Sequence, residues 1–178
     1  MMKAASIFLR AEITMDDVRR MIRWMENPHI TRFLNEDPQI VYFLQNLEEN
    51  VPEPMLGYHF NRLGRFFLVC DGTSQSIGFV KLVPQPNGAY EIVYVIGEET
   101  LWGHGMGKAA LRMALDKVFL EWRGTRVVAK IAPQNTRSIR SASACGFRQL
   151  GLDGKHMHFE MSDRAYFQQL SASRQKRA

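Results

Sequence analysis

The spacing of apolar residues in the first third of the chain predicts one strand followed by two helices. Residues 6–13 alternate between apolar and polar side chains, which is typical of a strand. Thr14 is the expected N-cap of the first helix, and Asn27-Pro28 ends that helix because proline lacks the amide hydrogen needed to continue it. A second helix is predicted over residues 40–47, and Pro52-Glu53-Pro54 closes this helical region.

The middle of the chain carries three successive strand signals, at residues 65–70, 76–83 and 90–96. Short turns at Asp71-Gly72 and at residues 84–88 separate them. Strands joined by such short turns run in opposite directions, so this segment is predicted to be an antiparallel meander.

The last third returns to a mixed pattern. The expected elements are a long helix over 109–122, a strand over 126–132, a short helix over 136–144 that ends at Gly146, a hairpin of 149–152 with 156–161, and a last helix from the cap Ser162 to about Leu170. The order β-α-α-β-β-β-α-β-α-β-β-α predicts a single α+β domain over residues 1–170. Residues 171–178 form an expected flexible, basic tail.

Charge and composition narrow the range of partners. The formal net charge is +5, and three of these charges come from Arg174, Lys176 and Arg177 in the tail, so a nucleic-acid partner is not favoured. No apolar run reaches the roughly 20 residues that cross a bilayer, which predicts a cytoplasmic protein without a membrane partner. The two cysteines, Cys70 and Cys145, make no disulfide framework and are expected to be buried.

The segment Leu101-Trp102-Gly103-His104-Gly105-Met106-Gly107-Lys108 precedes the long helix and carries the strongest chemical signal. Glycines at alternate positions let successive backbone amides point into one concavity in front of a helix N-terminus, which suits a pyrophosphate. The spacing fits neither a mononucleotide P-loop, since Ala109 stands where a hydroxyl would hold magnesium, nor a dinucleotide fingerprint. A plain strand-to-helix turn is the alternative interpretation.

Three motifs in order resemble the GNAT superfamily of N-acetyltransferases, in particular its ribosomal-protein N-terminal-alanine and spermidine acetyltransferase branch. They are Ile96-Gly97 with Trp102-Gly103-x-Gly105-x-Gly107, Asn135-x-x-Ser138 with Gly146-Phe147, and Trp24-x-x-Asn27-Pro28 with Thr31-Arg32-Phe33-Leu34. The resemblance runs from Ile7 to about Tyr166. It implies a mixed, mostly antiparallel central sheet whose fourth and fifth strands splay apart.

The resemblance also implies acetyl-coenzyme A (acetyl-CoA) as co-substrate and no metal. Backbone amides of the loop would hold the pyrophosphate, with Gly103, Gly105 and Gly107 setting its conformation, Lys108 adding charge, and the side chains of His104 and Met106 dispensable. The pantetheine arm would pair with the fourth strand at Tyr94, Val95 and Ile96, where an amide would also bind the reaction's oxyanion. The further cofactor contacts implied are Trp102, Asn135 and Ser138; Asn135 has the alternative role of a helix N-cap.

Two residues are candidates for the proton transfers. Glu91 on the fourth strand is the expected base that deprotonates the amine, and its alternative is an ordinary solvated strand residue. Family members commonly use a tyrosine on the helix after the fifth strand to protonate the departing thiolate. Ala142 stands at that position here, so Tyr94 is the substitute candidate.

The resemblance implies an acceptor site near the first two helices and the last hairpin. Glu36 and Asp37, in an acidic region with Glu48, Glu49 and Glu53, suggest a cationic acceptor, and His156 and His158 would border the same groove. A metal site built on His156, His158 and Glu160 lacks a further ligand, and a polar sheet face is the simpler interpretation.

Several acceptors and roles remain open at the level of sequence. A small-molecule amine such as a polyamine or an aminoglycoside, or a protein N-terminus, fits the resemblance, and a second copy of the chain is a candidate partner in a homodimer. A CoA-binding regulatory module without turnover is the alternative function, since Ala142 replaces the tyrosine. A nucleic-acid binder that uses the tail is the third hypothesis, and it predicts salt-sensitive binding.

Overall fold

The structure is a computed structural model that describes residues 6–34, 37 and 39–175. The helices are α1 (Met15–Glu26), α2 (Pro28–Thr31), α3 (Ile40–Asn50), α4 (Leu56–Phe60), α5 (Met106–Asp116), α6 (Thr136–Ala144) and α7 (Asp163–Gln175). The strands are β1 (Phe8–Arg10), β2 (Arg65–Cys70), β3 (Ser76–Gln85), β4 (Ala89–Ile96), β5 (Arg126–Ile131), β6 (Arg148–Asp153) and β7 (His156–Ser162). A π-helical turn, Lys117–Glu121, extends α5.

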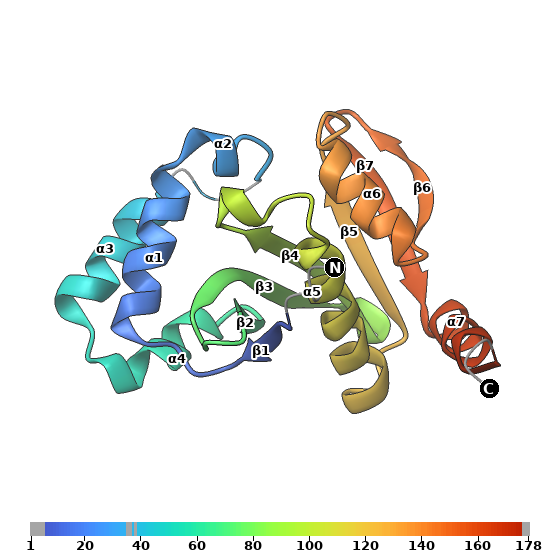
Figure 1. Ribbon diagram of the computed structural model, residues 1–178, viewed down its shortest axis with the longest axis horizontal. Coiled ribbons are helices and arrows are strands. Elements are labelled where there is room, and N and C mark those ends of the chain that lie inside the picture. The colour runs from blue at the N-terminus through green and yellow to red at the C-terminus, as the bar shows by residue number, and fades with distance from the viewer. Residues whose placement is uncertain (1–5, 35–36, 38, 176–178) are drawn as a thin grey trace.

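One seven-stranded sheet runs through the molecule in the order β1-β2-β3-β4-β5-β7-β6. All neighbouring strands are antiparallel except β4 and β5, which are parallel and pair only from Ala89↔Arg126 to Glu91↔Val128. Beyond Glu91 the two strands separate, and Figure 1 shows them diverging toward the top of the view. The expected mixed sheet with splayed fourth and fifth strands is therefore confirmed.

Alternate residues of β2, β3 and β4 face opposite sides of the sheet and divide the interior into two cores. The core on the α5 side includes Phe67, Val80, Ile92, Leu111 and Val118. The core under α1 and α3 includes Val18, Leu44, Leu68, Phe79 and Val95. Both faces of the central strands are therefore covered. The part of β4 beyond Glu91, which does not pair with β5, lies between the two cores.

All the predicted elements are present, whereas several boundaries were wrong and two short helices, α2 and α4, were not predicted. Strand β1 is shorter than residues 6–13 because the chain turns into the cap of α1 after Arg10. Helix α4 was not predicted, and its buried Leu56 shows that tertiary contacts stabilise this short segment. Helix α5 begins at Met106 rather than 109, and α7 continues past Leu170 to Gln175, so the first five residues of the expected tail are helical.

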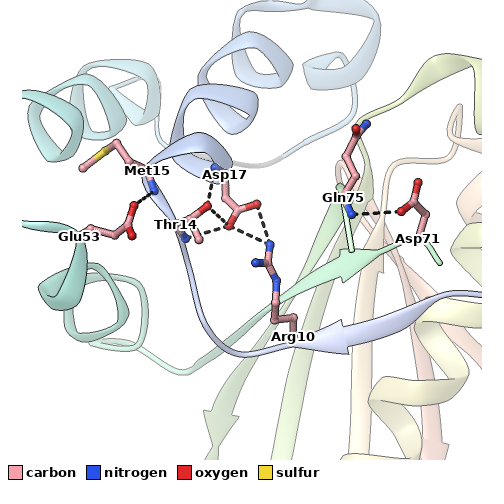
Figure 2. A network of polar contacts seen from close by, with 7 residues as sticks. All are labelled: Arg10, Thr14, Met15, Asp17, Glu53, Asp71 and Gln75. Carbon is pink, nitrogen blue, oxygen red and sulfur yellow. Dashed lines mark hydrogen bonds and ion pairs between the residues drawn. The ribbon is translucent and has the colours of Figure 1, made fainter. Parts of the chain in front are cut away.

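An ion pair and a capping box fix the start of α1 (Figure 2). The Arg10 guanidinium donates to both carboxylate oxygens of Asp17, at 2.8 and 2.9 Å, and Asp17 is only 4% exposed. The Asp17 carboxylate also accepts from the backbone amide of Thr14 at 2.8 Å, and the Thr14 hydroxyl accepts from the Asp17 amide. The predicted cap Thr14 is thus confirmed, and β1 is joined to α1 through one buried carboxylate.

We expect Asp17→Asn to lower the free energy of unfolding by about 2 kcal/mol. The asparagine side chain has one acceptor oxygen where the aspartate has two, and it carries no charge, so the Arg10 guanidinium would lose its ionic partner. Urea denaturation at neutral pH measures this change. Asp16→Asn is the matched control, since Asp16 is 84% exposed and pairs only with Arg19 in the described part of the chain. Equal destabilisation by both variants would contradict a structural role for the buried pair.

Candidate functional site

A cavity of about 360 Å³ lies where β4 separates from β5, between the N-terminus of α5 and helix α6. Its walls combine residues of the α2 corner, the end of β4, the glycine loop and α6. They are Ile30, Phe33, Leu34, Tyr94, Val95, Ile96, Leu101, Trp102, Gly103, Gly105, Met106, Gly107, Lys108, Asn135, Arg137, Ser138, Arg140, Ser141 and Ala144. The structure therefore brings together all the expected cofactor residues except the exposed His104.

The glycine loop is shorter than the sequence suggested. Gly103 and Gly105 have φ angles of +80° and +82°, a conformation that side chains disfavour, and Gly105 is the N-cap of α5. Gly107 lies inside the first helical turn, so its expected role as a conformational device was wrong. A Cβ atom at Gly107 would lie 3.4 Å from the ring of Tyr94, which is an ordinary van der Waals contact, so the helix could accept a small side chain at this position.

Trp102 connects the loop to both walls of the cavity. Its indole Nε1 donates to the carbonyl oxygen of Ile96 at 2.8 Å. The guanidinium of Arg137, on α6, lies 3.4 Å from the centroid of the Trp102 ring. Together with Lys108 and Arg140 in the cavity wall, Arg137 supplies positive charge, which suits a phosphate-bearing ligand.

Asn135 and Tyr94 meet at the N-terminus of α6. The Asn135 side chain accepts from the amide of Ser138 at 3.2 Å, so it serves as the helix cap in this structure. The Tyr94 hydroxyl donates to the carbonyl oxygen of Ser138 at 3.3 Å. Burial raises the pKa of Tyr94, so this hydroxyl is protonated at neutral pH and is a weaker acid than a solvated tyrosine.

Glu91 occupies the point where β4 and β5 part, as a member of their last pair. Its side chain points to the face of the sheet opposite Tyr94, since the two residues are an odd number of positions apart on one strand. The carboxylate forms an ion pair with Lys130 of β5 at 3.0 Å. Glu91 is thus a partly buried carboxylate at the vertex of the splayed strands, rather than a freely solvated strand residue.

His156 and His158 lie on β7, on the opposite face from the buried Phe159 and Met161, as the alternation predicted. His158 hydrogen-bonds Asp153 and stands opposite Lys130 in the ladder, so Lys130 lies between this histidine and Glu91. Within residues 6–34, 37 and 39–175, no cluster of three or more histidine, cysteine or acidic side chains could hold a metal.

The acidic residues near the first helices are mostly engaged in local contacts. Glu48 pairs with Arg19 at 2.8 Å, and Glu53 accepts from the amide of Met15 at 2.7 Å. Asp37 is exposed and lines a second cavity described below, whereas Glu36 lies outside the described residues. The structure gives less support to an acidic acceptor wall than the sequence suggested.

Sequence reasoning missed three contacts of this region. Trp24 is buried against Gly97, and a Cβ at Gly97 would approach its ring within 2.2 Å. The Trp24 indole donates to Glu98 at 3.2 Å, and the Asn27 amide donates to Glu99 at 2.7 Å. These contacts explain why Trp24, Asn27 and Ile96-Gly97 occur together as motifs, and the pairing of two distant motifs was the signal that could have found them.

The comparisons with known proteins agree with this architecture. Residues 7–148 match the family described as "Acetyltransferase (GNAT) domain". A relative from Bacillus licheniformis, named "Uncharacterized N-acetyltransferase p20", is 25% identical over 142 residues, which cover 79% of each chain. The chain therefore belongs to the GNAT acetyltransferase family. It is an acetyl-CoA-dependent N-acetyltransferase, which moves the acetyl group of the thioester to an amine.

Solved structures of low sequence identity share the fold. Spermidine N-acetyltransferase from Vibrio cholerae, solved with CoA and spermine, matches with a TM-score of 0.73 at 20% identity over 90% of this chain and 98% of its own. The aminoglycoside acetyltransferase AAC(6')-Ib, solved with coenzyme A, matches with a TM-score of 0.73 at 17% identity, over 92% of this chain and 98% of its own. Ribosomal-protein-S5-alanine acetyltransferase from Vibrio fischeri matches with a TM-score of 0.68 at 17% identity, over 93% of this chain and 97% of its own. None of the described helices is long and apolar enough to cross a membrane.

Proposed function

We propose that the cavity between β4 and α6 holds acetyl-CoA and that Glu91 accepts the proton of the attacking amine. The observation that carries this proposal is the end of the β4–β5 ladder at Glu91↔Val128. Beyond this pair the β4 backbone is free to bond an extended pantetheine arm, as an added strand would. The arm would run from the glycine loop toward the vertex, and its thioester would lie beside Glu91.

The reaction follows from this arrangement. A neutral amine, deprotonated by Glu91, attacks the thioester carbonyl, and a backbone amide of β4 stabilises the oxyanion. The C–N bond forms, the C–S bond breaks and the thiolate takes a proton from a donor. The attacking nitrogen releases its second proton as the amide forms, and this proton returns to the donor through solvent. Tyr94 is the proposed donor, because its hydroxyl reaches across from β4 to α6, where the family's tyrosine position holds the buried Ala142.

The acceptor is an amine, either a small molecule or a protein N-terminus. Solved proteins of this fold are named for spermidine, aminoglycosides and the alanine of a ribosomal protein. Asp37, His156 and His158 remain candidate acceptor contacts here, and Glu36 is a candidate outside the described residues. The His156 and His158 proposal is supported by the shared sheet face of Glu91, Lys130 and His158.

Thiol release from acetyl-CoA tests the proposed function against a panel of spermidine, an aminoglycoside, aromatic and aliphatic amines, free amino acids and peptides with free N-termini. Saturable release with one class supports the transferase and assigns its acceptor class. Tight CoA binding without release for any amine would favour the alternative, a CoA-binding regulatory module. Failure to bind CoA would contradict both functions.

We expect Gly105→Ala to raise the Kd for CoA by tenfold or more. Alanine disfavours the φ of +82° by about 1–2 kcal/mol, so the loop would relax and turn its amides away from the phosphates. Isothermal titration calorimetry measures the Kd. Gly154→Ala is the matched control, because Gly154 also has a positive φ and open space around its Cβ but lies in the β6–β7 turn. Equal affinity of both variants would contradict the phosphate role of the loop.

A further inference from the structure

A second cavity, of about 730 Å³, lies on the other face of the sheet, between α1, α3, α4 and strands β2 and β3. This volume is within the range of small-molecule sites. The lining residues are mainly aromatic and aliphatic, with charged groups among them. They include Met21, Met25, Asp37, Ile40, Phe43, Leu44, Arg62, Leu63, Phe66, Phe79 and Lys81.

Aromatic rings form the floor of this cavity. Phe66 packs on Phe60 and Phe79 with centroid distances of 4.8 and 5.3 Å. Such a surface favours an apolar, ring-sized group. The charged lining is unfavourable to a polycation, since Lys81 and Arg62 are basic and Asp37 is the one acidic side chain among the described lining residues.

Lys81 connects this cavity to the vertex of the splayed strands. On β3, Lys81 pairs with Val93 of β4, and the next residue on the same face, Val83, pairs with Glu91. Lys81 and Glu91 are therefore diagonal neighbours on one face of the sheet, a relation in which residues lie about 7–8 Å apart. Phe79 is the neighbour of Lys81 on this face in the opposite direction, away from Glu91, and it pairs with Val95, which lines the cofactor cavity.

Lys81 and Glu91 carry opposite charges, and they suit a ligand that has a carboxylate and an ammonium group on the same carbon atom. A carboxylate held by Lys81 would place the adjacent amino group toward Glu91 and the thioester, while the side chain enters the aromatic cavity. We propose that the acceptor is a free α-amino acid with a large apolar or aromatic side chain, bound through Lys81, Glu91 and the cavity floored by Phe66 and Phe79. This inference rests on the proposed function and names its substrate class.

The experiment measures kcat/KM for L-phenylalanine, phenethylamine, L-alanine and spermidine by thiol release. We expect L-phenylalanine to be the best substrate, with phenethylamine at least tenfold worse because it lacks the carboxylate. Lys81→Met is expected to abolish this preference by lowering kcat/KM for L-phenylalanine alone, and Lys81→Arg to retain it. Lys117→Met is the matched control on the α5 side of the sheet, where Lys117 contacts Phe67.

The outcomes separate this inference from the proposed function. Turnover of another amine class, unchanged by Lys81→Met, would overturn the amino-acid inference and leave the transferase intact. Absence of thiol release with every amine would overturn the proposed function. Saturation-transfer NMR with L-phenylalanine and the CoA-bound protein then decides the inference alone: binding that Lys81→Met removes supports it, and no binding overturns it. Unchanged circular dichroism confirms that the variants are folded.

Discussion

Replacing Glu91 by glutamine is expected to lower kcat by roughly 100- to 10,000-fold, the contribution typical of a general base. The amide has the shape of the carboxylate but cannot accept the proton of an alkylammonium. Glu91 lies at the last β4–β5 pair and is not part of the wall of the cofactor cavity. Its replacement should remove no contact with bound CoA, so the Kd for CoA should stay within about twofold of the wild type. Steady-state kinetics and calorimetry measure the two quantities.

Glu121→Gln is the matched control for this variant. Glu121 is an exposed carboxylate in the π-helical turn after α5, and it also pairs with a lysine, Lys117 at 3.2 Å. Its replacement should leave kcat unchanged. Full activity of Glu91→Gln would show that water or another side chain accepts the proton. An equal loss in both variants would point to a general effect of removing a carboxylate.

Gly97→Ala is expected to lower the free energy of unfolding by about 3 kcal/mol, at the upper end for overpacked sites. The added Cβ would lie 2.2–2.5 Å from three ring atoms of Trp24. Gly97 cannot move away easily, because its amide donates to the carbonyl oxygen of Ile77 at 2.8 Å. Urea denaturation measures the loss, and displacement of Trp24 should also disturb the α2 corner of the cofactor cavity.

A double-variant cycle tests the cause of this loss. In a Trp24→Ala background the ring is absent, so Gly97→Ala should cost much less than in the wild type. Gly57→Ala serves as the control glycine, since no atom lies within 4 Å of its Cβ and it belongs to helix α4. A similar cost of Gly97→Ala in both backgrounds would show that steric overlap with Trp24 is not the cause.

Local features of the chain were predictable because they depend on neighbours in sequence. The capping box at Thr14, the left-handed Gly146 after α6 and the Ser162 cap of α7 all appear as expected. The alternation of β7 correctly separated the buried Phe159 from the polar face of His158. The prediction was wrong where long-range contacts stabilise an element, as in α4, which was not predicted.

The arrangement of the site could not be predicted from the sequence, because it depends on the register of strands that are far apart in the chain. The sequence alone determined a mixed domain, the glycine loop and the candidate residues, because periodicity, turns and motif spacing are properties of contiguous segments. Only the tertiary structure decided that the β4–β5 ladder ends at Glu91, that Lys130 pairs with this carboxylate, that Lys81 is diagonal to Glu91 on the same face of the sheet, and that Trp24 packs on Gly97. Pairing register and packing between layers depend on the whole chain, and no local pattern encodes them.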